Sequence, residues 1–112
     1  MPQAMLSIWQ LSAIQLLKDC GRELHSDDLS HIRSKDDLIA LAKVILADVV
    51  QSGAHALTAA LYRLDISEQK IKWRTKSLSP DERLDEVAEA AAERCLRKVE
   101  MRRRFSERDG EL

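Results

Sequence analysis

Glycine and proline are scarce in this sequence, with three and two residues among 112. Both interrupt regular structure and are frequent in tight turns, so their scarcity argues against many short strands joined by turns. No stretch alternates apolar and polar residues in the manner of a strand. Apolar residues make up 45% and charged residues 33% of the chain, as in helical domains. We expect a single all-α domain over residues 1–112, a compact bundle of four or five helices with a long C-terminal helix.

The net charge is also small, and cysteine is rare. The formal charge of −1 provides no overall attraction to nucleic acids or anionic membranes, so any such attraction requires local clusters of basic residues. Cys20 and Cys95 are the only cysteines, and neither belongs to a Cys-x-x-Cys pair. This argues against a disulfide framework or a zinc site. We interpret both residues as reduced core thiols of a cytoplasmic protein.

Recognisable catalytic motifs are absent from the sequence. His25, His31 and His55 are scattered, and no His-x-x-x-His or Glu-x-x-His pair would place two metal ligands on one helix. The chain has neither a glycine-rich phosphate-binding loop nor a recognised Ser or Cys nucleophile motif. We therefore expect no enzymatic activity, no metal and no cofactor.

The first seventeen residues carry no charged side chain. Glutamines and serines interrupt this segment, which is too short and too polar to span a bilayer and lacks the basic start of a signal peptide. It instead predicts a helix from about Pro2 to Cys20, with Gly21 as its stop. Because this helix is apolar around most of its circumference, it should be buried on more than one side, and we expect a homodimer or another protein partner. The candidate interface residues are Met5, Ile8, Trp9, Leu11 and Leu16.

Local capping signals predict the later helices. Ser34 is expected to start a helix that Gly53 ends, and a third helix should run from about Ala54 to Leu64. Ser67 is expected to cap a short helix ending near Lys76. The segment Ser-Pro-Asp-Glu at residues 79–82 is a capping box, predicting a long helix from Pro80 to about Phe105 and a disordered tail over residues 106–112.

The long C-terminal helix has a divided charge. Residues 79–93 contain one basic and six acidic side chains, whereas residues 94–108 contain seven basic and two acidic side chains. The helix dipole favours this order. It does not explain Lys98 and Arg102, which lie in or beside the apolar stripe that contains Cys95. These two cations are solvated beyond the domain, or find acidic or carbonyl partners such as Asp65, or bind an external carboxylate or phosphate.

Residues 70–76 form a second basic segment, in which four cations surround Trp73. Such a pattern suits nucleic-acid binding, in which cations contact phosphates and an aromatic ring stacks on a base. The alternative is that Trp73 anchors a short helix to the core. Together with residues 94–104, this segment would provide the nucleic-acid contacts Lys70, Lys72, Trp73, Arg74, Lys76, Arg103 and Arg104.

Two motifs resemble those of a set of small, all-helical, uncharacterised bacterial proteins. They are LYRLDISEQK at residues 61–70, which contains an LYRxDxSE turn, and ERCLRKVEMRRRFS at residues 93–106, which contains an ERxxxKxxxR terminal helix. The resemblance implies a compact helical fold in a bacterial cytoplasm and no catalytic residues. Both motifs place charges beside apolar residues, so we expect Asp65 or Glu68 to pair with a cation of the terminal helix. The candidate charge cluster is Arg63, Asp65, Glu68, Arg94, Lys98 and Arg102.

These patterns favour a non-enzymatic protein–protein interaction or adaptor module that forms a homodimer through its first helix. The alternative is a nucleic-acid-binding protein that uses residues 70–76 and 94–104. A third interpretation is a regulator that binds an anionic ligand at Arg63, Lys98 and Arg102.

Overall fold

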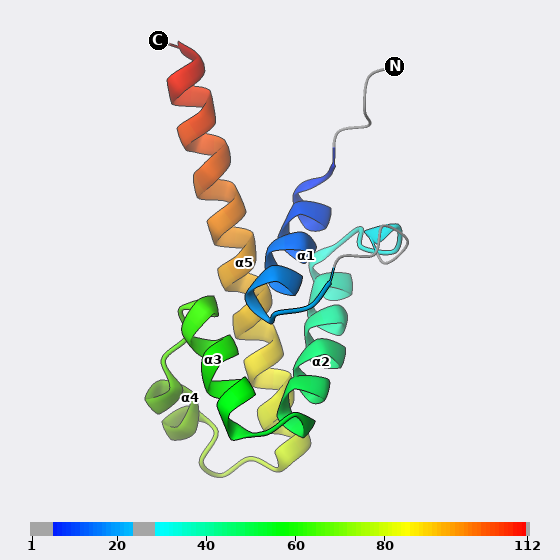
Figure 1. The fold of residues 1–112 in the computed structure, drawn as a ribbon, viewed down its shortest axis with the longest axis vertical. Helices are drawn as coiled ribbons and strands as arrows, with labels where there is room; N and C mark the ends of the chain where they lie inside the picture. The colour runs from blue at the N-terminus through cyan, green and yellow to red at the C-terminus, as the bar shows by residue number, and fades with distance from the viewer. Residues whose placement is uncertain (1–5, 24–28, 112) are drawn as a thin grey trace.

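The described part of the chain forms helices α1 (Ile8–Asp19), α2 (Lys35–Gln51), α3 (Ala54–Leu64), α4 (Glu68–Arg74) and α5 (Pro80–Glu111) (Figure 1). The computed structural model describes the backbone of residues 6–23 and 29–111, and the side chains of residues 6–23 and 29–105. Because these residues contain no strand, the prediction of an all-α bundle with a long C-terminal helix is confirmed. Among them, no helix has the length and apolar character that crossing a membrane requires.

Helix α1 begins at Ile8, whereas the sequence analysis placed its start near Pro2, which lies outside the described residues. Ser7 is extended and forms a capping box with Gln10. The Ser7 hydroxyl accepts a hydrogen bond from the Gln10 amide at 3.1 Å, and the Ser7 amide donates to the Gln10 side chain at 3.0 Å. These two bonds satisfy donors that a helix start leaves unpaired, which explains the later beginning. The helix ends before Gly21, whose φ of 70° is left-handed, as predicted.

The boundaries of α2, α3 and α4 follow the predicted signals. Ser34 caps α2 by accepting a hydrogen bond from the Asp37 amide at 3.2 Å. Gly53, with a φ of 115°, separates α2 from α3. Ser67 caps α4, which ends at Arg74 rather than near Lys76.

Helix α5 begins with the predicted capping box. The Ser79 hydroxyl accepts a hydrogen bond from the Glu82 amide at 3.2 Å, and the Ser79 amide donates to the Glu82 carboxylate at 3.3 Å. The helix continues past Phe105, where the sequence analysis expected it to end, to Glu111. Adding a residue to an existing helix costs far less than nucleating a new one, and no proline interrupts this segment.

One core joins α1, α2 and α5. Leu16 of α1 and Leu38 and Leu46 of α2 are fully buried. Small side chains on α5 let the two neighbouring helices approach closely, and dispersion contacts are strongest in such dense packing. The buried residues of α5 are Ala88, Ala91, Ala92, Cys95 and Val99.

Helices α3 and α4 lie beside the first half of α5, whereas its second half projects at the end of the molecule where α1 begins (Figure 1). The principal dimensions are 49 × 31 × 23 Å. Helix α4 contains no buried residue, and its most enclosed apolar side chain, Ile71, is only half-buried. This short helix therefore contributes little to the core, and it borders two surface grooves.

Candidate functional site

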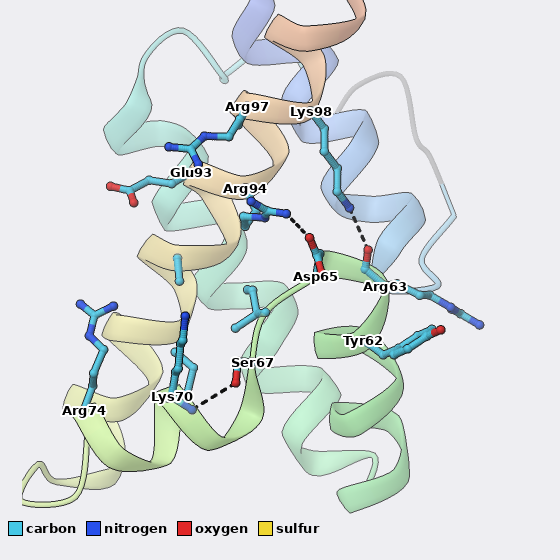
Figure 2. Close-up of a pocket in the computed structure, with 13 residues that line it drawn as sticks. Tyr62, Arg63, Asp65, Ser67, Lys70, Arg74, Glu93, Arg94, Arg97 and Lys98 are labelled. Atoms are coloured by element: carbon cyan, nitrogen blue, oxygen red, sulfur yellow. Dashed lines mark hydrogen bonds and ion pairs between the residues drawn. The ribbon is translucent and has the colours of Figure 1, made fainter.

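A groove of about 950 Å³ lies between α3, α4 and α5, and we call it the cationic groove (Figure 2). Its lining combines six basic and two acidic side chains with three aliphatic ones, which are Ile66, Ile71 and Ala90. The groove therefore offers positive charge beside apolar surface. The charged lining residues are Arg63, Asp65, Lys70, Arg74, Glu93, Arg94, Arg97 and Lys98.

The turn between α3 and α4 shapes one side of the cationic groove. Asp65 ends α3 in the left-handed conformation, with a φ of 61°, which aspartate tolerates better than most side chains. The Ile66 amide then donates a hydrogen bond to the Leu61 carbonyl at 2.9 Å, which closes the helix end. In this conformation the Asp65 carboxylate faces α5 and forms an ion pair with Arg94 (Figure 2). This is one of the pairings that the sequence analysis predicted.

Lys98 has an internal partner that the sequence analysis did not identify. Its ammonium group lies 2.8 Å from the carboxylate of Asp19, at the end of α1, and also donates to the Arg63 carbonyl at 2.8 Å (Figure 2). The side chains of Lys98 and Asp19 are only 25% and 11% exposed. One lysine therefore ties α5 to the ends of both α1 and α3.

Arg102 continues this network toward the projecting end of α5. Its guanidinium donates to the side-chain oxygen of Gln15, whose amide nitrogen donates to Asp19 at 2.9 Å. Gln15 and Asp19 lie one turn apart on α1 and are both buried. Of the three alternatives for Lys98 and Arg102, the structure shows internal pairing for both, although Arg102 itself is exposed.

A sequence signal for this network existed in α1. An acidic residue in the last turn of a helix is disfavoured by the dipole, and a buried carboxylate needs a partner. Asp19 meets both conditions and therefore indicates a nearby cation. The predicted first helix, from about Pro2 to Cys20, already places Asp19 in its last turn.

Two other members of the candidate charge cluster lie differently from the prediction. Glu68 faces Lys72 on its own helix at 3.8 Å and pairs with none of the described cations of α5. The Arg63 side chain extends away from α5, as does that of Tyr62, so only the Arg63 carbonyl contacts the network (Figure 2). These side chains border the end of the cationic groove.

The cations of the basic segment 70–76 separate into two sets. Lys70 and Arg74 line the cationic groove, whereas Lys72 and Lys76 line a second groove on the other side of α4. Trp73 lines neither groove and is 80% exposed, so the interpretation that it anchors α4 to the core is wrong. Residues four apart in a helix lie on the same face, whereas residues two apart lie on nearly opposite faces. Lys70 and Arg74 therefore face one groove, and Lys72 faces the other.

The second groove, of about 760 Å³, lies between α2, α3, α4 and the start of α5, and we call it the apolar groove. Most of its lining side chains are aliphatic. They are Leu46, Ala47, Val50, Leu57, Ile71, Pro80, Leu84 and Val87. Three cations and one carboxylate accompany them: Lys72, Lys76, Arg83 and Asp81.

Helix α1 provides fewer interface residues than the sequence analysis predicted. Leu16 is fully buried in the protein's own core, so its assignment to an interface is wrong. Ile8, Trp9 and Leu11 are half-buried, and Trp9 packs against the core. Met5 lies outside the described residues. The many-sided apolar character of α1 reflects contacts with α2, α3 and α5 on several sides.

Both cysteines are free and buried. Burial raises the pKa of the Cys20 thiol to about 11 and that of Cys95 to about 12, and the neighbouring Asp19 carboxylate adds to both increases. Neither thiol is therefore a nucleophile at neutral pH. Within the part of the chain that the structure describes, no group of three or more His, Cys, Asp and Glu side chains is arranged to hold a metal ion.

Comparison of the chain with models of known protein families, with curated proteins and with solved structures gives no match. The resemblance suggested by the two sequence motifs therefore stays a prediction. The function must be inferred from the two grooves and from the exposed surface.

Proposed function

We propose that this protein is a non-enzymatic interaction module that docks an acidic segment of a partner protein in the cationic groove. The observation that carries the proposal is that α4 and α5 contribute cations from two separate basic segments to one groove, beside the aliphatic side chains of Ile66, Ile71 and Ala90. An amphipathic acidic helix matches this combination, because its apolar residues and its carboxylates lie on neighbouring faces.

Two of the cations that α4 and α5 contribute to the groove remain available for a partner. Among the described side chains, Lys70 and Arg97 form no ion pair, whereas Arg94 and Lys98 are held by Asp65 and Asp19. Arg74 lies 3.4 Å from Glu86 in an exposed pair that a competing carboxylate could replace at little cost. The paired cations fix the shape of the groove, and the unpaired ones provide its charge.

Three features favour a protein partner over a nucleic acid. The one aromatic residue that lines the groove, Tyr62, extends its side chain away from α5, and exposed Trp73 lies outside the groove, so no ring lies among the cations of α4 and α5 to stack on a base. The division of the α4 cations between two grooves prevents one phosphate backbone from following all of them. The net charge of −1 also provides no long-range attraction to a polyanion.

Fluorescence anisotropy with a labelled helical peptide tests the proposal. The peptide carries leucines and glutamates at three- and four-residue spacing, and the control peptide has glutamine in place of each glutamate. We expect the acidic peptide to bind at low salt and the control to bind weakly. The double variant with Lys70→Glu and Arg97→Glu should weaken binding by more than about tenfold, which corresponds to about 1.4 kcal/mol.

The double variant with Arg103→Glu and Arg104→Glu is the matched control, because it makes the same charge change at exposed residues of α5 outside the groove. Equal loss in this variant, or no binding of the acidic peptide at low salt, would contradict the proposal. A labelled oligothymidine that binds more tightly than the peptide, with a dependence on Arg103 and Arg104, would instead support the nucleic-acid alternative.

Self-association is the second candidate function. Leu6, Met101 and Phe105 are exposed apolar side chains, and Leu6 precedes α1 at the end of the molecule where α5 projects (Figure 1). A homodimer through this end would cover them. Light scattering should then give a dimer mass that falls to a monomer mass in Phe105→Glu; a monomeric parent protein at high micromolar concentration would rule this out.

We also propose a reducing, cytoplasmic setting. Cys20 and Cys95 are free thiols inside the fold, as is usual where disulfides do not form.

A further inference from the structure

The apolar groove has walls of two different characters. Helices α2 and α3 contribute Leu46, Ala47, Val50 and Leu57, with Gln51 as the only polar residue on that side. Helix α4, the segment that follows it and the start of α5 contribute all of the charged residues, and the cations outnumber the carboxylate. One wall of the groove therefore suits a hydrocarbon chain, and the other suits an anionic group.

The positive charge at this groove is firmly placed. The Arg83 guanidinium donates to the carbonyls of Thr75 and Leu78, both at 3.1 Å, and to that of Lys76 at 3.5 Å. Carbonyl partners leave the charge of Arg83 uncompensated. Lys76 is exposed and forms no ion pair among the described side chains, whereas Lys72 has only a long contact with Glu68.

The groove offers little for a ligand that is polar throughout. Its neutral polar lining residues are Gln51 and Thr75, and the Thr75 hydroxyl already donates to the Ile71 carbonyl at 2.6 Å. The volume of about 760 Å³ lies within the range of small-molecule sites, which combine apolar walls with a few placed polar groups. A sugar or a nucleotide would leave its hydroxyl groups without partners here.

We propose that the apolar groove binds an anionic amphiphile, an acyl chain that ends in a carboxylate. The chain lies along the α2 and α3 wall, and the carboxylate lies at Lys72, Lys76 and Arg83. The charge complementarity and the aliphatic walls together select this class of ligand over a neutral lipid or a polar metabolite. The site is separate from the cationic groove, and only Ile71 lines both.

Isothermal titration calorimetry of the full chain with laurate, at laurate concentrations below the critical micelle concentration, tests the proposal. Val50 is 49% exposed in the groove, so Val50→Glu should preserve folding but place a charge against the acyl chain. We expect it to weaken laurate binding by more than about tenfold, since burying an unpaired charge is unfavourable. Lys76→Glu should weaken binding about three- to tenfold through lost attraction to the carboxylate.

Two matched variants should leave laurate binding unchanged. Val44→Glu makes the same change on the same helix at a position that is 70% exposed and outside the groove. Lys70→Glu reverses a charge on α4 that faces the other groove. Circular dichroism of each variant verifies the fold, so a loss in Val50→Glu alone reports on the groove.

Three results would overturn the proposal: no heat of binding with laurate, equal weakening by Val44→Glu, or equal affinity for the neutral amphiphile dodecyl maltoside. The acidic peptide described above provides an independent comparison. Lys70→Glu should weaken peptide binding but not laurate binding, and Lys76→Glu should do the reverse. Either groove can thus fail its test without affecting the result for the other.

Discussion

The Lys98 ammonium group lies 2.8 Å from the Asp19 carboxylate, although the two residues are 79 positions apart in the chain. The pair joins the ends of α1 and α3 to α5 through a site that is largely shielded from water. Its position next to the buried Gln15 makes it part of the core boundary rather than a surface contact.

We expect Lys98→Met to lower the free energy of unfolding by about 1–3 kcal/mol, because the shielded Asp19 carboxylate would lose its cation and, among the described side chains, keep the hydrogen bond from Gln15 alone. Urea unfolding followed by circular dichroism measures this. A double-mutant cycle with Asp19→Asn should give a favourable coupling energy. Lys43→Met, which breaks the exposed pair with Asp85, is the control and should change stability much less. If Lys98→Met and Lys43→Met lowered the free energy of unfolding equally, the shielding of the Lys98–Asp19 pair from water would be unimportant for stability.

Leu16→Ala should lower the free energy of unfolding by about 2–5 kcal/mol, because it removes a fully buried side chain and leaves a cavity in the core. Leu6→Ala, at an exposed position, should change stability by less than about 0.5 kcal/mol. Thermal or urea unfolding measures both. If Leu16→Ala kept full stability and instead changed the solution mass, Leu16 would be an interface residue after all.

Gly53→Ala should lower the free energy of unfolding by about 1–3 kcal/mol. The cost comes from the backbone, since φ is 115° and, apart from Gly53 and its two neighbours in the chain, no atom lies within 4 Å of the position an added Cβ would take. Gln51→Ala, an exposed change at the end of α2, serves as the control. A neutral or stabilising effect of Gly53→Ala in urea unfolding would mean that the α2–α3 junction readily adopts another conformation.

The two buried thiols should make stability depend on alkaline pH. Their pKa values rise from 9.0 to about 11 for Cys20 and about 12 for Cys95 in the folded protein. The unfolded chain therefore loses these protons first, so their stabilising contribution is complete below pH 9 and falls between about pH 9 and 11 for Cys20 and between about pH 9 and 12 for Cys95. Each thiol should contribute a slope of up to about 1.4 kcal/mol per pH unit.

Urea unfolding as a function of pH measures this slope. The double variant with Cys20→Ala and Cys95→Ala is the reference, because it keeps every other ionisable group of the protein. We expect the variant to show a flatter decline above pH 9, whatever its absolute stability. Parallel curves for the two proteins would show that the thiols do not contribute.

Short-range chemistry made most of the fold predictable. Ser34, Ser67 and Ser79 each bond to an amide three residues away, so the signal for a helix start lies within four residues. Gly53 ends α2 through its own conformation. The capping box of Ser7 and Gln10 is an equally local signal. The uncharged apolar segment before it, however, favoured a helix that begins near Pro2.

The parts of the site that depend on distant residues were less predictable. The pair of Arg94 and Asp65 was predictable because both residues lie in recognisable motifs. The pair of Lys98 and Asp19 was not predicted, because Asp19 lies in a helix whose other residues are mostly apolar. The exposure of Trp73 depends on how α4 docks, which neighbouring residues do not determine. The division of the α4 cations between two grooves likewise follows from the positions of α2, α3 and α5.

The central position of α5 has a consequence for biosynthesis. The core faces of α1 and α2 are covered by Ala88, Ala91 and Cys95 of the helix that leaves the ribosome last among those described. Until α5 emerges, Leu16, Leu46 and other apolar side chains of the nascent chain are not covered by this helix. Folding should thus be completed only after α5 emerges, and nascent chains stalled before Pro80 should be substrates for chaperones.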